Sequence, residues 1–382
     1  MTLTATAAER PAAPLPFFPT HPAWSLPLNN LLTDAPAYDG TLAFVPIAGD
    51  RLVAYDLKSG TLAWTVTAAP TLPPAAGEGL VFFREKDAVV ALRAADGSAA
   101  WRLPLDLALA APPVWDNGWL ILAGENGTIV ALSAKDGRII WRHDIGARPH
   151  ARPALSADRV YVPVANARVI ALRVESGEPL WDRHLGGDPN EILAFDDRLY
   201  IGAKDKYLYC LDAATGVVEW RSMRTGADVI GLPAFDDDQL YFVSLDNVLR
   251  AVSRRTGVQQ WMKQLAVRPT SGPIRAGATI IAVGQAAALP TFNAKDGAPV
   301  GPLATAPELA APPHVVIDPG SALPTLVILT KDLAKGLTTT VSLIMRGIDP
   351  TPAPFAALPS AITTLPTVSP GVPGEPRGQT PD

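Results

Sequence analysis

The sequence is poor in cysteine and in charge, and each shortage excludes a class of structure. Cys210 is the only cysteine in 382 residues, so neither an intramolecular disulfide nor a cysteine-based metal cluster can form. We interpret it as a small buried thiol. Charged residues make up 18% and the net charge is -5, which gives no basic surface for nucleic acid. No eighteen apolar residues run together, so we expect no transmembrane helix.

Motifs for export and for catalysis are also missing. Residues 1–19 have no basic segment followed by an apolar one, so the chain as written carries no recognisable export signal. Gly-x-Ser-x-Gly, His-Glu-x-x-His and a phosphate-binding glycine loop do not occur. The aspartates at 196–197 and 236–238 fall where turns are expected, and we interpret them as turn formers rather than calcium ligands. Nothing in the sequence indicates an enzyme or a metal site.

What the sequence does contain is a repeat, seen most fully between Cys210 and Trp220. Strand residues lead into Asp-Ala-Ala-Thr, Gly216 closes a turn where a positive φ costs little, and the chain returns to Trp220. Six other segments copy this layout, with the glycine four residues before the tryptophan place. These places are Trp64, Trp101, Trp141, Trp181, Trp220, Trp261 and, with glycine instead, Gly301. A period near 40 residues with strand-type composition indicates a propeller or solenoid.

Two further strands precede each hairpin. A β-branched and aromatic strand begins about 20 residues before each tryptophan place. Ahead of it lies a short stretch of small residues with proline, which suits the crowded innermost strand of a propeller blade. We assign this stretch to residues 35–37, 69–71, 111–113, 152–154, 232–234 and 272–274. Each repeat therefore predicts one four-stranded antiparallel blade.

The two ends of the chain predict how the ring closes. Residues 312–316, 325–330 and 339–346 resemble three strands of an eighth blade that lacks its fourth, and Trp24 lies 40 residues before Trp64. We therefore expect an all-β, eight-bladed β-propeller in which the N-terminal strand completes the last blade and removes two free edges. The predicted domains are a disordered leader at 1–20, the propeller at 21–349 with residues 21–30 in the last blade, and a proline-rich disordered tail at 350–382.

The run Ala-x-Asp-x-x-Thr-Gly-x-x-x-Trp resembles the tryptophan-docking motif of the pyrroloquinoline-quinone-like (PQQ-like) β-propeller repeat family, over about residues 22–347. In that family each indole packs over the motif of the neighbouring blade. The resemblance therefore implies structural docking roles for Trp24, Trp64, Trp101, Trp141, Trp181, Trp220 and Trp261.

The family has branches with different functions. Its alcohol and glucose dehydrogenases hold the quinone with a calcium ion in the central channel, and many have an adjacent cysteine pair, which this sequence lacks. A branch without chemistry includes the outer-membrane lipoprotein that scaffolds barrel assembly, and the layout here is closest to that branch. A third branch is attached to kinases, and no kinase sequence is present.

Two polar connectors stand out as candidate binding loops at the channel mouth. One contains Arg148, His150 and Arg152, and the other contains Asp188, Asn190 and Glu191. The arginines suit a carboxylate or phosphate and the acidic group suits a cation, although solvated loops are polar without any ligand. Arg268 and the hairpin tip at 204–206 are candidates for the same face, and arginines near His150 favour its neutral form.

These observations predict a non-enzymatic scaffold that binds a protein or peptide partner through its channel-face loops, without a cofactor. The alternative is a quinoprotein dehydrogenase, or a remnant of one, that uses PQQ with calcium. We expect a monomer with no nucleic-acid partner. For the location, the missing export signal indicates the cytoplasm, whereas the family resemblance indicates the periplasm or cell envelope.

Overall fold

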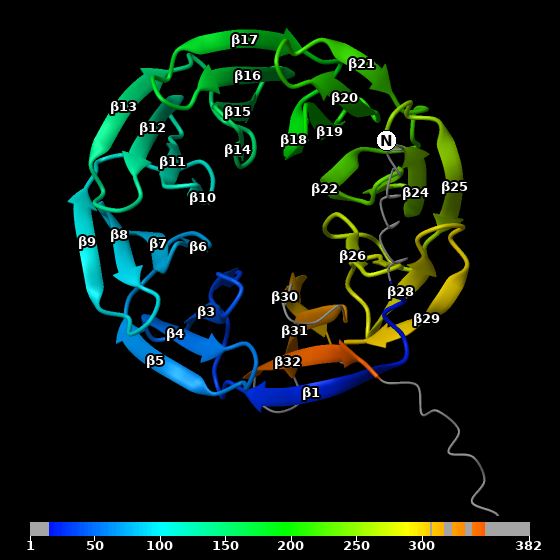
Figure 1. Ribbon diagram of the computed structural model, residues 1–382, viewed down its shortest axis with the longest axis horizontal. Helices are drawn as coiled ribbons and strands as arrows, with labels where there is room; N and C mark the ends of the chain where they lie inside the picture. Colours follow the sequence, from blue (N-terminus) through cyan, green and yellow to red (C-terminus); the bar gives the residue numbers. More distant parts are fainter. Residues whose placement is uncertain (1–14, 306–307, 317–322, 333–337, 348–382) are drawn as a thin grey trace, which may run out of the picture. The chain divides into compact units, whose positions relative to one another are not determined.

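The computed structural model describes residues 15–305, 308–316, 323–332 and 338–347. All 32 regular elements in these ranges are β-strands. This part of the chain accordingly has no helix long and apolar enough to cross a membrane. The strands form eight four-stranded antiparallel sheets around a central channel (Figure 1). The predicted eight-bladed propeller is confirmed.

The first four blades follow one another along the chain, and in each the first strand is innermost. Blade 1 contains β2 (Ala37–Tyr38), β3 (Leu42–Ile47), β4 (Arg51–Asp56) and β5 (Leu62–Thr67). Blade 2 contains β6 (Ala75–Gly77), β7 (Leu80–Glu85), β8 (Ala88–Arg93) and β9 (Ala99–Pro104). Blade 3 contains β10 (Val114–Asp116), β11 (Trp119–Ala123), β12 (Thr128–Ser133) and β13 (Ile139–Asp144). Blade 4 contains β14 (Ala154–Ser156), β15 (Arg159–Val164), β16 (Arg168–Arg173) and β17 (Pro179–His184).

The remaining blades repeat the order, except that the last one takes a strand from the N-terminus. Blade 5 contains β18 (Pro189–Phe195), β19 (Arg198–Ala203), β20 (Leu208–Asp212) and β21 (Val218–Arg221). Blade 6 contains β22 (Val229–Phe235), β23 (Gln239–Ser244), β24 (Val248–Ser253) and β25 (Gln259–Gln264). Blade 7 contains β26 (Ile274–Ala276), β27 (Thr279–Ile281), β28 (Ala288–Asn293) and β29 (Pro299–Ala304). Blade 8 contains β30 (Glu308–Val316), β31 (Thr325–Asp332), β32 (Thr338–Arg346) and β1 (Thr20–Pro27).

Closure of the ring depends on β1, which lies outside β32 (Figure 1). The two strands pair antiparallel, with Trp24 opposite Leu343 and Ser25 opposite Ser342. The two serine hydroxyls are 2.8 Å apart and share a hydrogen bond. The N-terminal strand therefore supplies the missing fourth strand of blade 8, as the sequence predicted, and covers the edge that β32 would otherwise expose.

The outer hairpins explain why the repeat has its sequence. In blade 5, Asp212 Oδ1 accepts hydrogen bonds from the backbone N–H of Thr215 at 2.8 Å and from its hydroxyl at 2.6 Å, which fixes the turn. Gly216 follows at φ +66°, and a Cβ there would lie 2.6 Å from Cε3 of Trp181 in blade 4. The glycine is needed both for the turn and for the approach of the indole.

All seven tryptophans of the repeat make the same contact across a seam between blades. Each indole lies against the turn glycine of the next blade: Trp24 on Gly60, Trp64 on Gly97, Trp101 on Gly137, Trp141 on Gly177, Trp181 on Gly216, Trp220 on Gly257 and Trp261 on Gly297. Six of them also donate Nε1–H to the carbonyl oxygen three residues before that glycine. The exception is Trp220, whose Nε1 is buried without a partner among the described residues.

Blade 7 has Gly301 in the tryptophan place, and the N-terminal segment compensates for it. A Cβ at Gly301 would lie 3.7 Å from the ring of Phe18, while Phe17 is fully buried between blades 7 and 8. Phe17 N donates to the hydroxyl of Thr279 at 2.9 Å, and Ala278 N donates to Leu15 O at 2.8 Å. The packed part of the chain therefore includes residues 15–19, which the sequence analysis had assigned to the leader.

Two of the predicted innermost stretches lie outside the strands. Residues 111–113 end directly before β10. Residues 69–71 precede blade 2 but are not in a strand; the innermost strand is β6, and the prolines directly before it are Pro73 and Pro74. Thr71 N instead bonds to Arg84 O at 2.9 Å, beside the turn between β7 and β8. The first proline after the tryptophan strand, Pro70, therefore does not mark the innermost strand of this blade.

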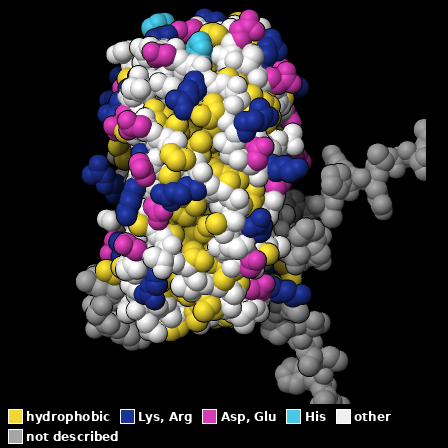
Figure 2. Space-filling view, turned by 90° about the vertical axis from the view of Figure 1, so that its left-hand side faces the viewer, with side chains coloured by type: hydrophobic (Ala, Val, Ile, Leu, Met, Phe, Trp, Pro, Cys, Tyr) yellow, Lys and Arg dark blue, Asp and Glu magenta, His cyan; other side chains and the backbone are white. Residues whose placement is uncertain are grey.

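The outer wall of the ring is mixed in character. Figure 2 looks at the wall formed by β9 and β13, where hydrophobic side chains run down the middle and lysines, arginines, aspartates and glutamates alternate on both sides. On this side no charge of one sign accumulates, in keeping with the low net charge.

Candidate functional site at the channel and its mouth

The innermost strands enclose a cavity of about 730 Å³ in the channel. Its wall is formed largely by small and rigid residues, seven alanines and seven prolines. We call the prolines the proline collar; its members are Pro36, Pro73, Pro74, Pro112, Pro113, Pro312 and Pro313. The larger side chains in the wall are Tyr38, Val114, Trp115, Arg152, Glu191, Leu232 and His314. A cavity of this size with few polar groups is typical of a binding site.

Bulges in three innermost strands shape this cavity. The register shifts between Pro189 and Ile192 in β18, between Ile230 and Ala234 in β22, and between Ala311 and His314 in β30. The bulged residues include Glu191, Leu232 and the Pro312–Pro313 pair, and all of them line the cavity. Bulges commonly redirect side chains beside functional sites, and here they direct blades 5, 6 and 8 into the channel.

The structure corrects the predicted acidic connector. Asn190 and Glu191 are not in a loop but in β18, the innermost strand of blade 5. The side-chain amide of Asn190 donates to the carbonyl oxygen of Val229 in blade 6, so it joins two blades. Only Asp188 remains in the connector. As strand residues, Asn190 and Glu191 contact different neighbours. The local sequence did not reveal the strand, because Gly-Gly-Asp-Pro-Asn is typical of a turn.

Arg152 lies beside Glu191 in the wall of the channel. Both residues line the main cavity and also a second one of about 320 Å³, which Trp115 and Leu232 border as well. They are the only arginine, lysine, aspartate or glutamate residues in the wall of the main cavity. The channel therefore offers one guanidinium and one carboxylate within a largely apolar wall.

His314 and Tyr38 stack across the seam between blades 8 and 1. Their ring centroids are 3.9 Å apart and the ring planes differ by 3°. Burial lowers the pKa of His314 to about 4, so the imidazole is neutral at physiological pH. Burial also raises the pKa of Tyr38, and its hydroxyl has no hydrogen-bond partner among the described residues. The pair forms a flat, uncharged platform in the cavity wall.

Arg148, His150 and Asp188 lie at the mouth of the channel. Arg148 Nη2 contacts Glu125 Oε1 of blade 3 at 2.8 Å. Asp188 Oδ2 contacts Lys204 Nζ at 3.4 Å, and its Oδ1 accepts from Ala167 N at 3.0 Å. Backbone and lysine contacts thus outweigh the partial burial and lower the pKa of Asp188, with the bond from Ala167 the largest cause.

The pKa of His150 is lowered, as its surroundings predict, which favours the neutral imidazole. Burial lowers its pKa most, and the positive charges of Lys204 and Arg148 lower it further, while Asp188 opposes them. The mouth therefore brings Arg148, His150 and Asp188 into one electrostatic environment. No hydroxyl or thiol nucleophile is hydrogen-bonded to His150 among the residues described.

Arg268 is on the linker between blades 6 and 7, which opens on the same face of the ring. Its side chain is exposed, and its carbonyl oxygen would lie 2.6 Å from a Cβ at Gly284. The adjacent Pro269 forms an isolated bridge with Gly284, so the backbone of this linker is held in place. The structure does not bring Arg268 into contact with the group at Arg148 and Asp188.

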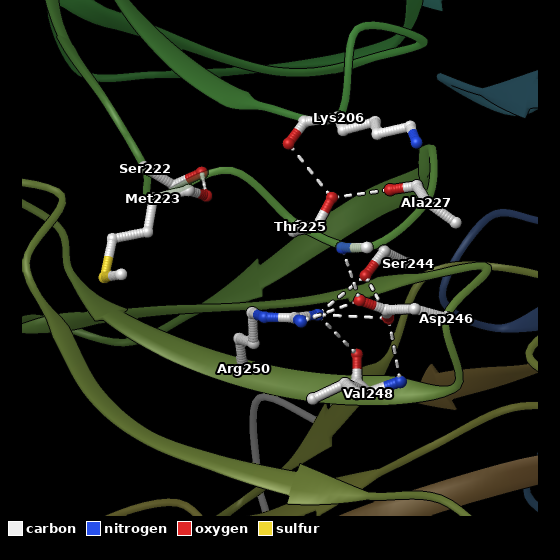
Figure 3. A network of polar contacts seen from close by, with 10 residues as sticks. Lys206, Ser222, Met223, Thr225, Ala227, Ser244, Asp246, Val248 and Arg250 are labelled. Atoms are coloured by element: carbon white, nitrogen blue, oxygen red, sulfur yellow. Dashed lines mark hydrogen bonds and ion pairs between the residues drawn. The ribbon is translucent and has the colours of Figure 1, made fainter.

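A partly buried polar network supports the mouth between blades 5 and 6 (Figure 3). Asp246 accepts from Arg250 Nη2 at 2.7 Å, Ser244 Oγ at 2.6 Å and Gly226 N at 2.8 Å. Burial raises the pKa of this carboxyl, but these hydrogen bonds outweigh burial and lower the pKa to about 2. Nearby, Thr225 Oγ1 donates to a backbone carbonyl and is buried. The network holds in place the linker at 222–228, which follows β21, an outer strand of only four residues.

Sequence reasoning missed the aromatic residues of the cavity, Tyr38, Trp115 and His314. A signal existed, because each follows a proline of the collar by one or two residues: Pro36 precedes Tyr38, and Pro313 precedes His314. Aromatic residues at this position are unusual among the small residues of the innermost strands. The pattern could have indicated that blades 1, 3 and 8 present rings to the channel.

The residues present do not fit a quinone with calcium. Calcium takes six to eight oxygen ligands, whereas Glu191 is the one carboxylate in the wall of the main cavity. The described ranges hold no group of three or more His, Cys, Asp or Glu side chains that could bind a metal. Cys210 is buried, and burial together with Glu219 raises its thiol pKa to about 12, so it is an inert core residue.

Comparison with known proteins agrees with this architecture. The family model described as outer membrane protein assembly factor BamB matches residues 21–107, 48–197 and 190–307. No curated protein sequence matches the chain.

Solved structures share the fold at low identity. BamB from Moraxella catarrhalis is 22% identical with a TM-score of 0.65, over 84% of this chain and 97% of that one. A europium-containing methanol dehydrogenase is 12% identical with a TM-score of 0.68, over 85% and 93%. The quinohemoprotein alcohol dehydrogenase ADHIIG from Pseudomonas putida HK5 is 13% identical with a TM-score of 0.66, over 86% and 76%. By the extent of the family match, this chain belongs to the PQQ-like β-propeller family described as outer membrane protein assembly factor BamB.

Proposed function

We propose that the chain is a non-enzymatic scaffold that binds a protein or peptide partner through the loops at the channel mouth. The observation that carries this proposal is the exposure of the ion pairs there. The side chains of Arg148 and Glu125 are 63% and 50% exposed, and those of Lys204 and Asp188 are 46% and 30% exposed. Such pairs contribute about 0–1 kcal/mol to stability. Exchanging them for contacts with a partner therefore costs the fold little.

The chemistry of the channel supports the same proposal. His150 has no hydrogen-bonded nucleophile beside it in the described chain, and the cavity wall is mostly alanine and proline. Membership of a family described by an assembly factor supports a protein partner and a place in the bacterial cell envelope. The fold alone does not separate a scaffold from a dehydrogenase.

A charge-reversal experiment tests the scaffold proposal. A photo-cross-linking residue at His150 would identify the partner in cells, and binding of the purified partner would then be measured. We expect Arg148→Glu combined with Lys204→Glu to weaken binding at least ten-fold. Lys135→Glu combined with Arg138→Glu is the control, because it also reverses one lysine and one arginine but on the opposite face, in the turn between β12 and β13. Equal binding by the unaltered chain, the variant at Arg148 and Lys204, and the control would contradict a binding site at the mouth.

The second candidate is a quinoprotein dehydrogenase or its remnant, which the likeness to the two dehydrogenase folds favours. Titration of the purified chain with PQQ and calcium tests it, with quinone absorbance and thermal stability as readouts. A shift of either would replace the scaffold proposal. The absence of a shift at excess cofactor would remove the dehydrogenase from consideration.

A further inference from the structure

The proline collar limits what kind of peptide the channel can hold. A peptide that adds to a sheet as a strand needs alternating N–H and C=O groups along the exposed edge. Proline has no N–H, and blades 1, 2, 3 and 8 each place one or two prolines in the cavity wall. In blades 1, 2 and 3 these prolines come before innermost strands of only two or three residues, and in blade 8 Pro312 and Pro313 lie within β30. Such short or proline-interrupted edges offer little ladder to an added strand, so β-augmentation is disfavoured here.

The same wall contains two hydrogen-bond donors that lack acceptors. Tyr38 Oη and Trp115 Nε1 are both shielded from water and have no partner among the described residues. Leaving a buried polar group without a partner is unfavourable, so a ligand that pairs with it gains affinity. Both rings line the cavity. A bound molecule that presents carbonyl oxygens at this wall would supply the acceptors that these donors lack.

The two rings are also held in defined positions. A Cβ at Gly77 would lie 2.2 Å from Cε3 of Trp115, so the indole of blade 3 rests directly on the backbone of blade 2. Tyr38 is held by its 3.9 Å stack on His314. Aromatic surfaces that are rigid before binding lose little entropy when a ligand arrives.

We infer that the cavity binds a proline-rich segment of the partner in the polyproline II conformation. Such a segment has no internal hydrogen bonds and leaves its carbonyl oxygens free. It docks on aromatic-lined grooves and needs no strand ladder. A donor-bearing aromatic wall in which seven positions are proline matches these requirements. This inference rests on the proposed function, because it gives the chemistry of a peptide partner.

Charge complementarity adds a second requirement for the segment. Arg152 and Glu191 come from blades 4 and 5 and border both cavities of the channel. One attracts an acidic side chain and the other a basic one. The preferred ligand is therefore a proline-rich segment with an acidic residue on one side and a basic residue on the other.

The test uses the full chain and two labelled peptides of equal length and charge. The probe is fluorescein-Asp-Ala-Pro-Pro-Ala-Pro-Pro-Lys, and the control peptide has valine and threonine in place of the prolines, which favours an extended strand. Fluorescence anisotropy measures both. We expect the proline peptide to bind at least ten-fold more tightly. Equal affinities, or no binding of the proline peptide at millimolar concentration, would overturn the inference.

Variants locate the site. Tyr38→Phe removes the hydroxyl and keeps the ring, and Trp115→Phe removes the N–H and leaves a smaller aromatic ring. Each should weaken binding of the proline peptide at least about five-fold, the loss of one hydrogen bond. Trp119→Phe, in the same blade but outside the cavity wall, should bind like the unaltered chain. Thermal melts establish that all three variants are folded. Unchanged affinity of the folded Trp115 and Tyr38 variants would also contradict the inference.

Failure of this inference differs from failure of the proposed function. If charge reversal at Arg148 and Lys204 abolishes partner binding but no proline peptide enters the channel, the scaffold stands and the polyproline ligand is wrong. If neither charge reversal nor the cavity variants affect the partner, both are wrong.

Discussion

The indole Nε1–H of Trp141 donates a hydrogen bond to the carbonyl oxygen of Val174, 2.6 Å away across the seam between blades 3 and 4. The equivalent nitrogen of Trp220 has no partner among the described residues, although its indole rests on Gly257 in the same way. The position that supplies the carbonyl is a small or aliphatic residue in the other blades and Arg254 in blade 6. Packing of the indole and its hydrogen bond are thus separable in this molecule.

Because of this difference, we expect a Trp→Phe substitution to lower the free energy of unfolding by different amounts at the two positions. Trp141→Phe removes a hydrogen bond and leaves the Val174 carbonyl unpaired, whereas Trp220→Phe removes only ring area. We expect Trp141→Phe to lower the free energy of unfolding by about 1–2 kcal/mol more than Trp220→Phe. Urea denaturation of the two variants measures this. Equal losses would show that the hydrogen bond adds nothing beyond packing.

A second prediction concerns the N-terminal segment at the seam of blades 7 and 8. Phe17 is fully buried, whereas the nearby Leu15 is 42% exposed. Phe17→Ala should cost about 3–5 kcal/mol, and Leu15→Ala, the control, should cost less than about 1 kcal/mol. Thermal melts of the full-length variants report both. A Phe17 variant that melts like the unaltered chain would mean that this segment does not stabilise the ring.

The buried imidazole of His314 predicts a pH dependence of stability. Its pKa is lowered to about 4 in the fold, against an ordinary value near 6.5. Between these values the unfolded chain binds the proton and the folded chain does not, so stability rises with pH. The contribution is fully present above about pH 6.5 and is lost as pH falls through 4, and it amounts to about 3 kcal/mol.

His314→Phe keeps a ring against Tyr38 and removes the titration. Denaturation curves from pH 7 to pH 4 should therefore be flatter for this variant than for the unaltered chain. Some slope will remain, because His150 shifts in the same direction. Parallel pH profiles for the two proteins would exclude His314 as a source of acid sensitivity.

The network around Asp246 predicts a separate effect in stronger acid. Its carboxyl has a pKa of about 2 in the fold and an ordinary value near 3.9. Its contribution is therefore present above about pH 4 and lost as pH falls towards 2. Asp246→Asn should lower the free energy of unfolding by about 2 kcal/mol at pH 7 and by much less at pH 2.5.

A matched aspartate controls this experiment. Asp237→Asn changes an exposed residue in the turn between β22 and β23 and should cost less than about 0.5 kcal/mol. Chemical denaturation at the two pH values compares the variants. A cost at Asp246 that does not depend on pH would mean that the network acts through packing and neutral hydrogen bonds.

The sequence by itself determined the ring. The glycine four residues before each tryptophan, as in Gly216 and Trp220, defines a local turn whose geometry depends on neighbouring residues only. The period then counts the blades, and the isolated Trp24 strand indicates how they close. These features are readable because a hairpin and its docking contact recur in every copy.

Only the tertiary structure decided what faces the channel. Tyr38 and His314 are 276 residues apart in the chain, and they meet only because the ring closes. Glu191 reaches the cavity through a bulge that is set by pairing with β19, and Phe17 fills a seam left by Gly301. Each of these positions depends on contacts between distant segments. A local pattern cannot specify them, because the same Gly, Pro and Asp residues favour a loop wherever long-range pairing does not impose a strand.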